Sequence, residues 1–183
     1  MARDTLSRSL HDVGLAAWFG GTLANAVALN SAAGTADDPS QRGRVANAGW
    51  DRWTPVNLAA IAAHLAGSVG QLSGNKSRIA AQEGVATMTT VKTALTAAAL
   101  GATAYSRVLG RRVSDYGDVP VESGAQPTYS TPPEVEKAQS QLRMLQWAIP
   151  ALTGALVVVT SFAGEQQRQT EVKKGVLRGL LPF

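Results

Sequence analysis

Residues 144–164, MLQWAIPALTGALVVVTSFAG, decide the fold class because they contain no charged residue. A helix needs about 20 apolar residues to cross a hydrocarbon core of about 30 Å. An amphipathic helix of a soluble protein would instead carry charged side chains along its outer face. The stretch therefore predicts a transmembrane helix over about residues 142–164.

Three further windows resemble this stretch in length and in their lack of charge. They cover residues 13–36, 53–75 and 84–106, and the last is interrupted only by Lys92. We therefore predict an all-α protein with a single membrane domain over residues 1–183. It is a polytopic bundle of four transmembrane helices, over about residues 13–34, 53–73, 86–108 and 142–164.

Two other interpretations stay open for these windows. Charge-free helices are also compatible with a soluble, alanine-rich helical bundle, although such a bundle would have little polar surface. Arg3 and Arg8 followed by an apolar stretch are also typical of a signal peptide. The first window is long for a signal peptide and contains Trp18 and Asn25, so we interpret it as a membrane span.

Composition excludes several classes of site. The chain has no cysteine, which excludes disulfides and thiolate ligands, and only two histidines, His11 and His64. Charged residues make up 16 % of the chain, below the roughly 25 % of soluble domains. The net charge of +4 is scattered between apolar segments without aromatic interleaving, so we expect no nucleic-acid partner. No nucleotide-binding loop or catalytic triad is recognisable, and we expect neither a cofactor nor an enzymatic activity.

The connections are predicted from their polar, glycine and proline content. Residues 34–52 form a polar connection, residues 73–83 a short loop and residues 110–133 a long exposed loop. The sequence Thr131-Pro132-Pro133-Glu134 is a helix start signal. Residues 171–183 form a basic amphipathic tail, suited either to an interfacial helix on anionic phospholipids or to a frayed helix end. Four spans place both termini on one side, which we predict to be the cytoplasmic side of a bacterial inner membrane.

Aromatic and basic residues flank the windows at matching depths. In three spans they fall where the helix would meet the membrane surface, as an aromatic belt requires. Lys92 and Arg107 can each extend toward their own surface, although Lys92 is also open to interpretation as a buried functional charge. The predicted interface anchors are Trp53, Lys92, Tyr105, Arg107 and Trp147.

Small residues at four-residue spacing predict close helix packing in the membrane, either within the bundle or against a larger partner. The predicted packing residues are Gly20, Gly21, Asn25, His64, Gly67 and Gly101. Asn25 and His64 have similar depths in an antiparallel pair, so we expect them to hydrogen-bond. An alternative for His64 is a proton-relay or quinone-contact site. His11 and His64 differ in predicted depth by about 16 Å, which excludes a bis-histidine haem.

GLAAWFGG at residues 14–21 and NAVALN at residues 25–30 resemble small four-span membrane proteins of mycobacteria and related actinobacteria. That group includes an associated factor of the cytochrome bc1–aa3 respiratory supercomplex. The resemblance implies a non-catalytic accessory subunit or assembly factor that packs against other transmembrane subunits. Two alternatives remain: a small transporter or channel-like homo-oligomer, and a quinone-contacting subunit of a membrane oxidoreductase.

Overall fold

The computed structural model describes residues 5–76, 79 and 83–165 of the chain. Within these residues the protein is all-helical apart from one short β-hairpin, so the predicted fold class is confirmed at this level. The first helical segment comprises α1 (Thr5–Ala24), the π-helical turn η1 (Asn25–Leu29) and α2 (Asn30–Ala33). The others are α3 (Pro39–Gly74), α5 (Glu83–Asp115) and α6 (Pro133–Glu165), with strands β1 (Val121–Ser123) and β2 (Gln126–Pro127) before α6.

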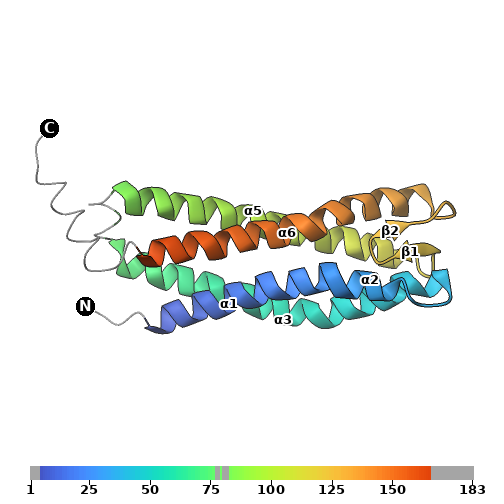
Figure 1. Cartoon of the computed structure of the whole chain (residues 1–183), viewed down its shortest axis with the longest axis horizontal. Helices are drawn as coiled ribbons and strands as arrows, with labels where there is room; N and C mark the ends of the chain where they lie inside the picture. Colours follow the sequence, from blue (N-terminus) through green and yellow to red (C-terminus); the bar gives the residue numbers. More distant parts are fainter. Residues whose placement is uncertain (1–4, 77–78, 80–82, 166–183) are drawn as a thin grey trace, which may run out of the picture.

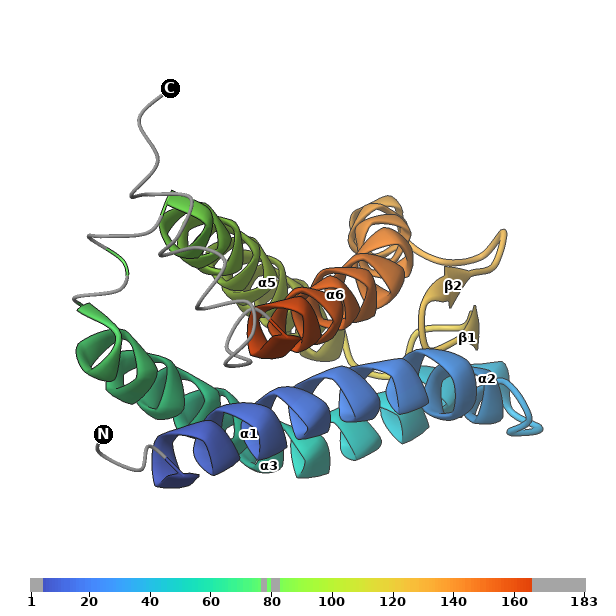
Figure 2. The ribbon, with the colours of Figure 1, turned by 60° about the vertical axis from the view of Figure 1, so that its left-hand side comes forward.

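The four long segments form an elongated bundle of two antiparallel pairs, α1 with α3 and α5 with α6 (Figure 1). Contacts between α1 and α6 join the pairs, whereas α3 and α5 make few contacts. Figure 2 shows α3 and α5 diverging toward the end of the bundle where α1 begins and α3 ends. We call this the Thr5 end, and the opposite end, which carries β1 and β2, the hairpin end.

The helices are longer than the uncharged windows predict. α3 has 36 residues and α5 and α6 have 33 each, which corresponds to about 50 Å of helix rise. Most of residues 34–52, predicted as a polar connection, therefore belong to α3. The reason is a strong start signal at Asp38-Pro39, where the Ser40 hydroxyl and amide donate to the Asp38 carboxylate and lower its pKa.

Residues 110–133 are also more ordered than the predicted exposed loop. α5 continues to Asp115 because Leu109 and Val113 are buried against Val135 and Ala138 of α6. The hairpin that follows is partly buried too, with Val121 only 1 % exposed. α6 begins at Pro133, as its start signal predicts. The Thr131 hydroxyl turns away from the helix and donates to the Pro120 carbonyl at 2.7 Å.

A buried polar network holds the hairpin end together. The Asn30 side-chain amide donates to the side-chain oxygen of Gln146 at 2.8 Å and accepts from the Trp50 indole at 3.1 Å. The Gly124 amide donates to the Asn30 carbonyl at 3.3 Å. Asn30 thereby connects α2, α3, α6 and the hairpin. A polar residue near the end of the first uncharged window thus holds together the elements at the hairpin end.

Two helical segments are long and apolar enough to cross a membrane, Thr5–Ala33 and Pro133–Gly164. α3 and α5 do not reach that level, because alanine, glycine and small polar residues fill their uncharged windows and α3 also contains charged residues near its start. By length and composition the structure thus supports two of the four predicted spans. The predicted tail, residues 171–183, lies outside the described residues.

Candidate functional site

Two glycines set the register between α1 and α3. A Cβ atom built on Gly67 would collide with the amide nitrogen of His11 and the carbonyl oxygen of Ser7. A Cβ atom on Gly14 would collide with the Ala60 carbonyl oxygen and the His64 amide. Gly67 is among the predicted packing residues, whereas Gly14 was missed. The two helix backbones approach so closely only because neither position carries a side chain.

The other predicted glycines behave differently from one another. Gly21 faces the half-buried Trp53 ring, which occupies the space that a Cβ atom would take. Trp53, predicted as an interface anchor, therefore also packs inside the α1–α3 pair. Gly20 and Gly101 are exposed, and a Cβ atom on either would meet nothing within 4 Å. Neither residue packs within the bundle, because their faces of α1 and α5 turn outward, and packing against a larger partner stays a prediction for them.

The register pairs His64 with His11, not with Asn25. The two imidazole rings lie 4.5 Å apart between centroids, and both side chains are fully buried. The Trp18 ring lies edge-on to His64 at 6.1 Å. Asn25 lies one turn beyond Gly21, close to the level of Trp53, and about 16 Å of α3 separates Trp53 from His64. The predicted Asn25–His64 contact is therefore wrong.

The predicted depth difference between His11 and His64 is wrong for the same reason. It assumed that the uncharged windows of α1 and α3 align end to end, but the glycine contacts shift α1 along α3. The rings contact each other directly, and His64 Nδ1 lies 3.4 Å from the His11 carbonyl oxygen. This contact leaves no space for a porphyrin between the rings.

Two charged side chains lie near this histidine pair: Asp12, which precedes the first predicted span, and Lys92, which lies within the third. His11 Nδ1 is 2.7 Å from an Asp12 carboxylate oxygen, and the Asp12 side chain is 62 % exposed. Lys92 of α5 lies within electrostatic range of Asp12 and of both imidazoles. Among the described residues, the Nε2 atoms of His11 and His64 have no hydrogen-bond partner. The described residues also contain no group of three or more histidine, aspartate or glutamate side chains that could hold a metal ion.

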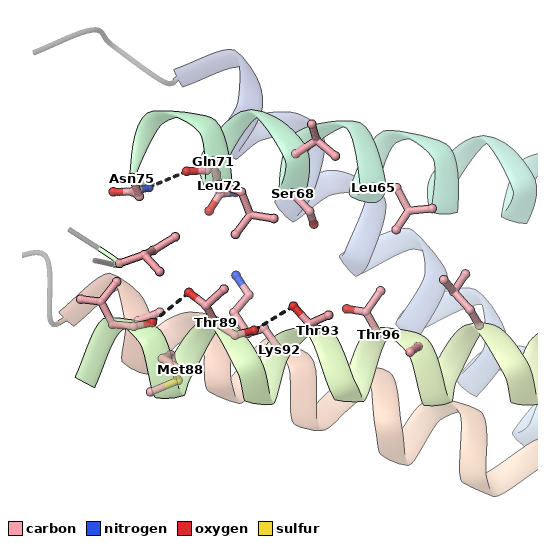
Figure 3. A pocket seen from close by; sticks show the side chains of 16 residues that line it. Leu65, Ser68, Gln71, Leu72, Asn75, Met88, Thr89, Lys92, Thr93 and Thr96 are labelled. Carbon is pink, nitrogen blue, oxygen red and sulfur yellow. Dashed lines mark hydrogen bonds between the residues drawn. The ribbon is translucent and has the colours of Figure 1, made fainter. Parts of the chain in front are cut away.

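A cleft opens between α3 and α5 toward the Thr5 end, with a volume of about 500 Å³ (Figure 3). Hydroxyls on its walls bond back to their own helices, as in Ser68 to the His64 carbonyl and Thr93 to the Thr89 carbonyl, both within 2.9 Å. The walls therefore present mainly hydrocarbon. The lining residues are Leu65, Ser68, Val69, Gln71, Leu72, Asn75, Ile79, Val85, Met88, Thr89, Lys92, Thr93, Thr96, Ala97, Leu100 and Ala163.

Lys92 extends from α5 into this cleft, toward α3 (Figure 3). It is half-buried and lies between two helices of the bundle, not on the outer surface of the bundle. Within the residues whose side chains are described, no carboxylate lies within ion-pair distance of its ammonium group. Lys92 therefore lies in a cleft between two helices, and its snorkelling role stays a prediction.

The remaining predicted anchors lie in one section of the bundle, about 10 Å long. Arg107 donates to the Asp51 carboxylate at 2.6 Å, which joins α5 to α3. The Tyr105 hydroxyl donates to the Gln141 side-chain oxygen at 2.8 Å, which joins α5 to α6. Trp147 is 51 % exposed one to two turns further along α6. The structure therefore places these side chains in one belt around three helices.

No family model, curated protein or solved structure matches the chain.

Proposed function

We propose that this protein crosses the bacterial inner membrane four times and acts as a non-catalytic accessory or assembly subunit of a larger membrane complex. A respiratory bc1–aa3 supercomplex is the first partner to test, on the resemblance of residues 14–21 and 25–30. The length and exposed apolar surface of the bundle support the membrane spans, and an unpacked face of α1 supports the accessory role.

The belt of Asp51, Tyr105, Arg107 and Trp147 supports a common membrane surface. From this belt to the Thr5 end, α3 and α5 each rise about 33 Å, close to the hydrocarbon thickness of about 30 Å. Over that distance large apolar side chains are exposed on all four helices. Examples are Val13 on α1, Leu58 and Val69 on α3, Val91 on α5, and Val158 and Phe162 on α6. Such a surface is costly in water and favourable in lipid.

The hairpin end would project beyond the bilayer. α3 begins there with the polar residues 39–52, and α5 ends there with Arg111 and Arg112. The exposed Arg44 and Asp118 lie 3.5 Å apart across the start of α3 and the segment before β1. Charged side chains and an ion pair of this kind are suited to water, so we expect the hairpin end to form a small domain outside the membrane.

Single-cysteine labelling tests the four spans, since the natural chain has no cysteine to remove. With both termini cytoplasmic, Asp118→Cys should react with a membrane-impermeant maleimide in intact cells. Lys76→Cys, in the turn after α3, should react only after permeabilisation. α3 would cross the membrane from the hairpin end to the Thr5 end, so Lys76 would lie on the opposite side from Asp118. Val158→Cys should stay unlabelled in both conditions. Labelling of Asp118→Cys and Lys76→Cys from the same side would contradict four spans.

The observation that carries the accessory-subunit proposal is the outward face of α1. Ala16, Gly20 and Ala24 follow at four-residue spacing, and all three are exposed. A Cβ atom on Gly20 would meet nothing within 4 Å, so no described part of this chain uses the face. In lipid, helices associate where small residues let their backbones approach, since the hydrophobic effect does not drive them together. This face suits a transmembrane helix of another subunit.

Mild-detergent affinity purification of the tagged protein at native level tests this proposal. The unmodified chain should copurify with other transmembrane subunits, and a respiratory partner would add haem absorption bands to the eluate. Gly20→Leu should abolish copurification while the protein remains folded, because the leucine fills the face without touching the bundle. Gly164→Leu, at an equally open glycine near the end of α6, is the matched control and should retain the partner.

A colourless homo-oligomer in both variants and in the unmodified protein would overturn the accessory role and favour a transporter. Loss of the partner in Gly164→Leu as well as in Gly20→Leu would show that added bulk anywhere disturbs the complex. The α1 face would then have no special part in it.

A further inference from the structure

We propose that the cleft between α3 and α5 binds one membrane lipid with an anionic headgroup, with an acyl chain between the helices and the anion paired with Lys92. This inference rests on the membrane-spanning arrangement proposed above, because the bilayer is the source of the ligand. It does not depend on any partner protein.

The size of the cleft indicates what kind of occupant it accepts. Its volume of about 500 Å³ lies within the range of roughly 300–1,000 Å³ for small-molecule sites. A cleft of this size is suited to a thin, flexible chain.

The walls match a hydrocarbon chain. Leu65 and Leu72 of α3 and Met88 and Leu100 of α5 are among the residues that line the cleft, and the lining extends over about 22 Å of α5. The hydroxyls of Ser68, Thr89 and Thr93 already donate to carbonyls of their own helices, so they need no partner from a ligand. An acyl chain would make dispersion contacts along this length.

The charge of Lys92 specifies the headgroup. An ammonium group turned between two helices is costly in a membrane unless an anion or water compensates it. Asp12 is within electrostatic range of Lys92 but not within ion-pair distance. A helical lysine leans toward the N-terminus of its helix, which for α5 is the Thr5 end and therefore the nearer membrane surface. The exposed Lys76 follows Asn75, which lines the same end of the cleft. A phosphate or other anionic headgroup at that surface would compensate both cations.

The test is native mass spectrometry of the detergent-purified full chain. The protein is incubated with phosphatidylglycerol or with phosphatidylcholine of identical acyl chains, and the retained lipid is counted. The unmodified protein should retain one phosphatidylglycerol in about tenfold preference over phosphatidylcholine, the scale of one charged hydrogen bond. Lys92→Met should remove this preference, and Lys92→Arg should keep most of it. Lys137→Met, an exposed lysine of α6 away from the cleft, should leave it unchanged.

A second variant tests the acyl-chain part separately. Ala97→Phe fills the cleft without changing charge and should reduce the retention of both lipids. An unchanged phosphatidylglycerol preference in Lys92→Met, or unchanged retention in Ala97→Phe, would overturn the lipid site. Recovery of the chain in the soluble fraction without detergent would instead overturn the membrane-spanning proposal. The two failures are therefore distinguishable.

Discussion

Gly67→Ala is expected to lower the free energy of unfolding by about 2–3 kcal/mol, the upper part of the range typical of overpacked cores. The added methyl group would collide with the backbone of α1 at Ser7 and His11, and backbone atoms cannot rotate away as a side chain can. The loss should appear although alanine is a better helix former than glycine by about 1 kcal/mol. In a chain of this size it corresponds to a fall of roughly 5–10 °C in the thermal midpoint.

Gly20→Ala is the matched control, because it adds the same methyl group to the same helix pair at an open position. Its midpoint in detergent, followed by size-exclusion chromatography after heating, should stay the same or rise slightly. Equal midpoints for Gly67→Ala and Gly20→Ala would contradict the α1–α3 register described above. The histidine pair would then have to be placed anew as well.

Trp18→Ala is expected to be more damaging still, by about 3–5 kcal/mol, as for other large-to-small changes of buried aromatic residues. Trp18 is 0 % exposed and lies in the central layer of the bundle with Ile61 and Ala99. Its indole donates to the Thr103 hydroxyl at 3.2 Å, so the side chain ties α1 to α5 as well as to α3. Alanine would leave a cavity where three helices meet.

Trp147→Ala provides the comparison, since this indole is 51 % exposed and belongs to the belt around the bundle. Its thermal midpoint should change by much less, within about 1 kcal/mol of the unmodified protein, as is usual away from buried features. A similar loss for Trp147→Ala and Trp18→Ala would mean that the central layer is not the core of the fold. Both variants can be measured in the same detergent and with the same heating protocol.

Much of the architecture was predictable because it is local. Charge-free windows predict helices, and Thr131-Pro132-Pro133-Glu134 predicts where α6 begins. The matching depths of Tyr105, Arg107 and Trp147 also follow from counting residues along each helix. Helix length was underestimated because residues 39–52 are polar but helical. The polarity of a segment indicates whether it suits water or lipid, but it does not show whether the segment is a helix or a loop.

The site itself could be found only in part. His64 and Lys92 are conspicuous as polar groups within apolar windows. In the structure, His64 belongs to the buried histidine pair and Lys92 lines the cleft between α3 and α5. Asp12 and His11 were missed as their neighbours, since they precede the first window and counting placed them at the surface. No local sequence signal predicts that Asp12 and His11 lie near His64, because their position depends on the register of α1 along α3.

By itself, the amino-acid sequence determined the helical class, the central parts of the long helices and the spacing of the belt residues along each helix. These depend on hydropathy and on helix rise, which are properties of each segment alone. Only the tertiary structure decided that Gly67 packs and Gly20 does not, that His11 meets His64, and that Lys92 enters a cleft. In a helix suited to lipid, the outward face is as apolar as the inward one, so periodicity does not reveal which side is buried. Register is then settled by the fit of single side chains against a neighbouring backbone, a contact between residues far apart in the chain.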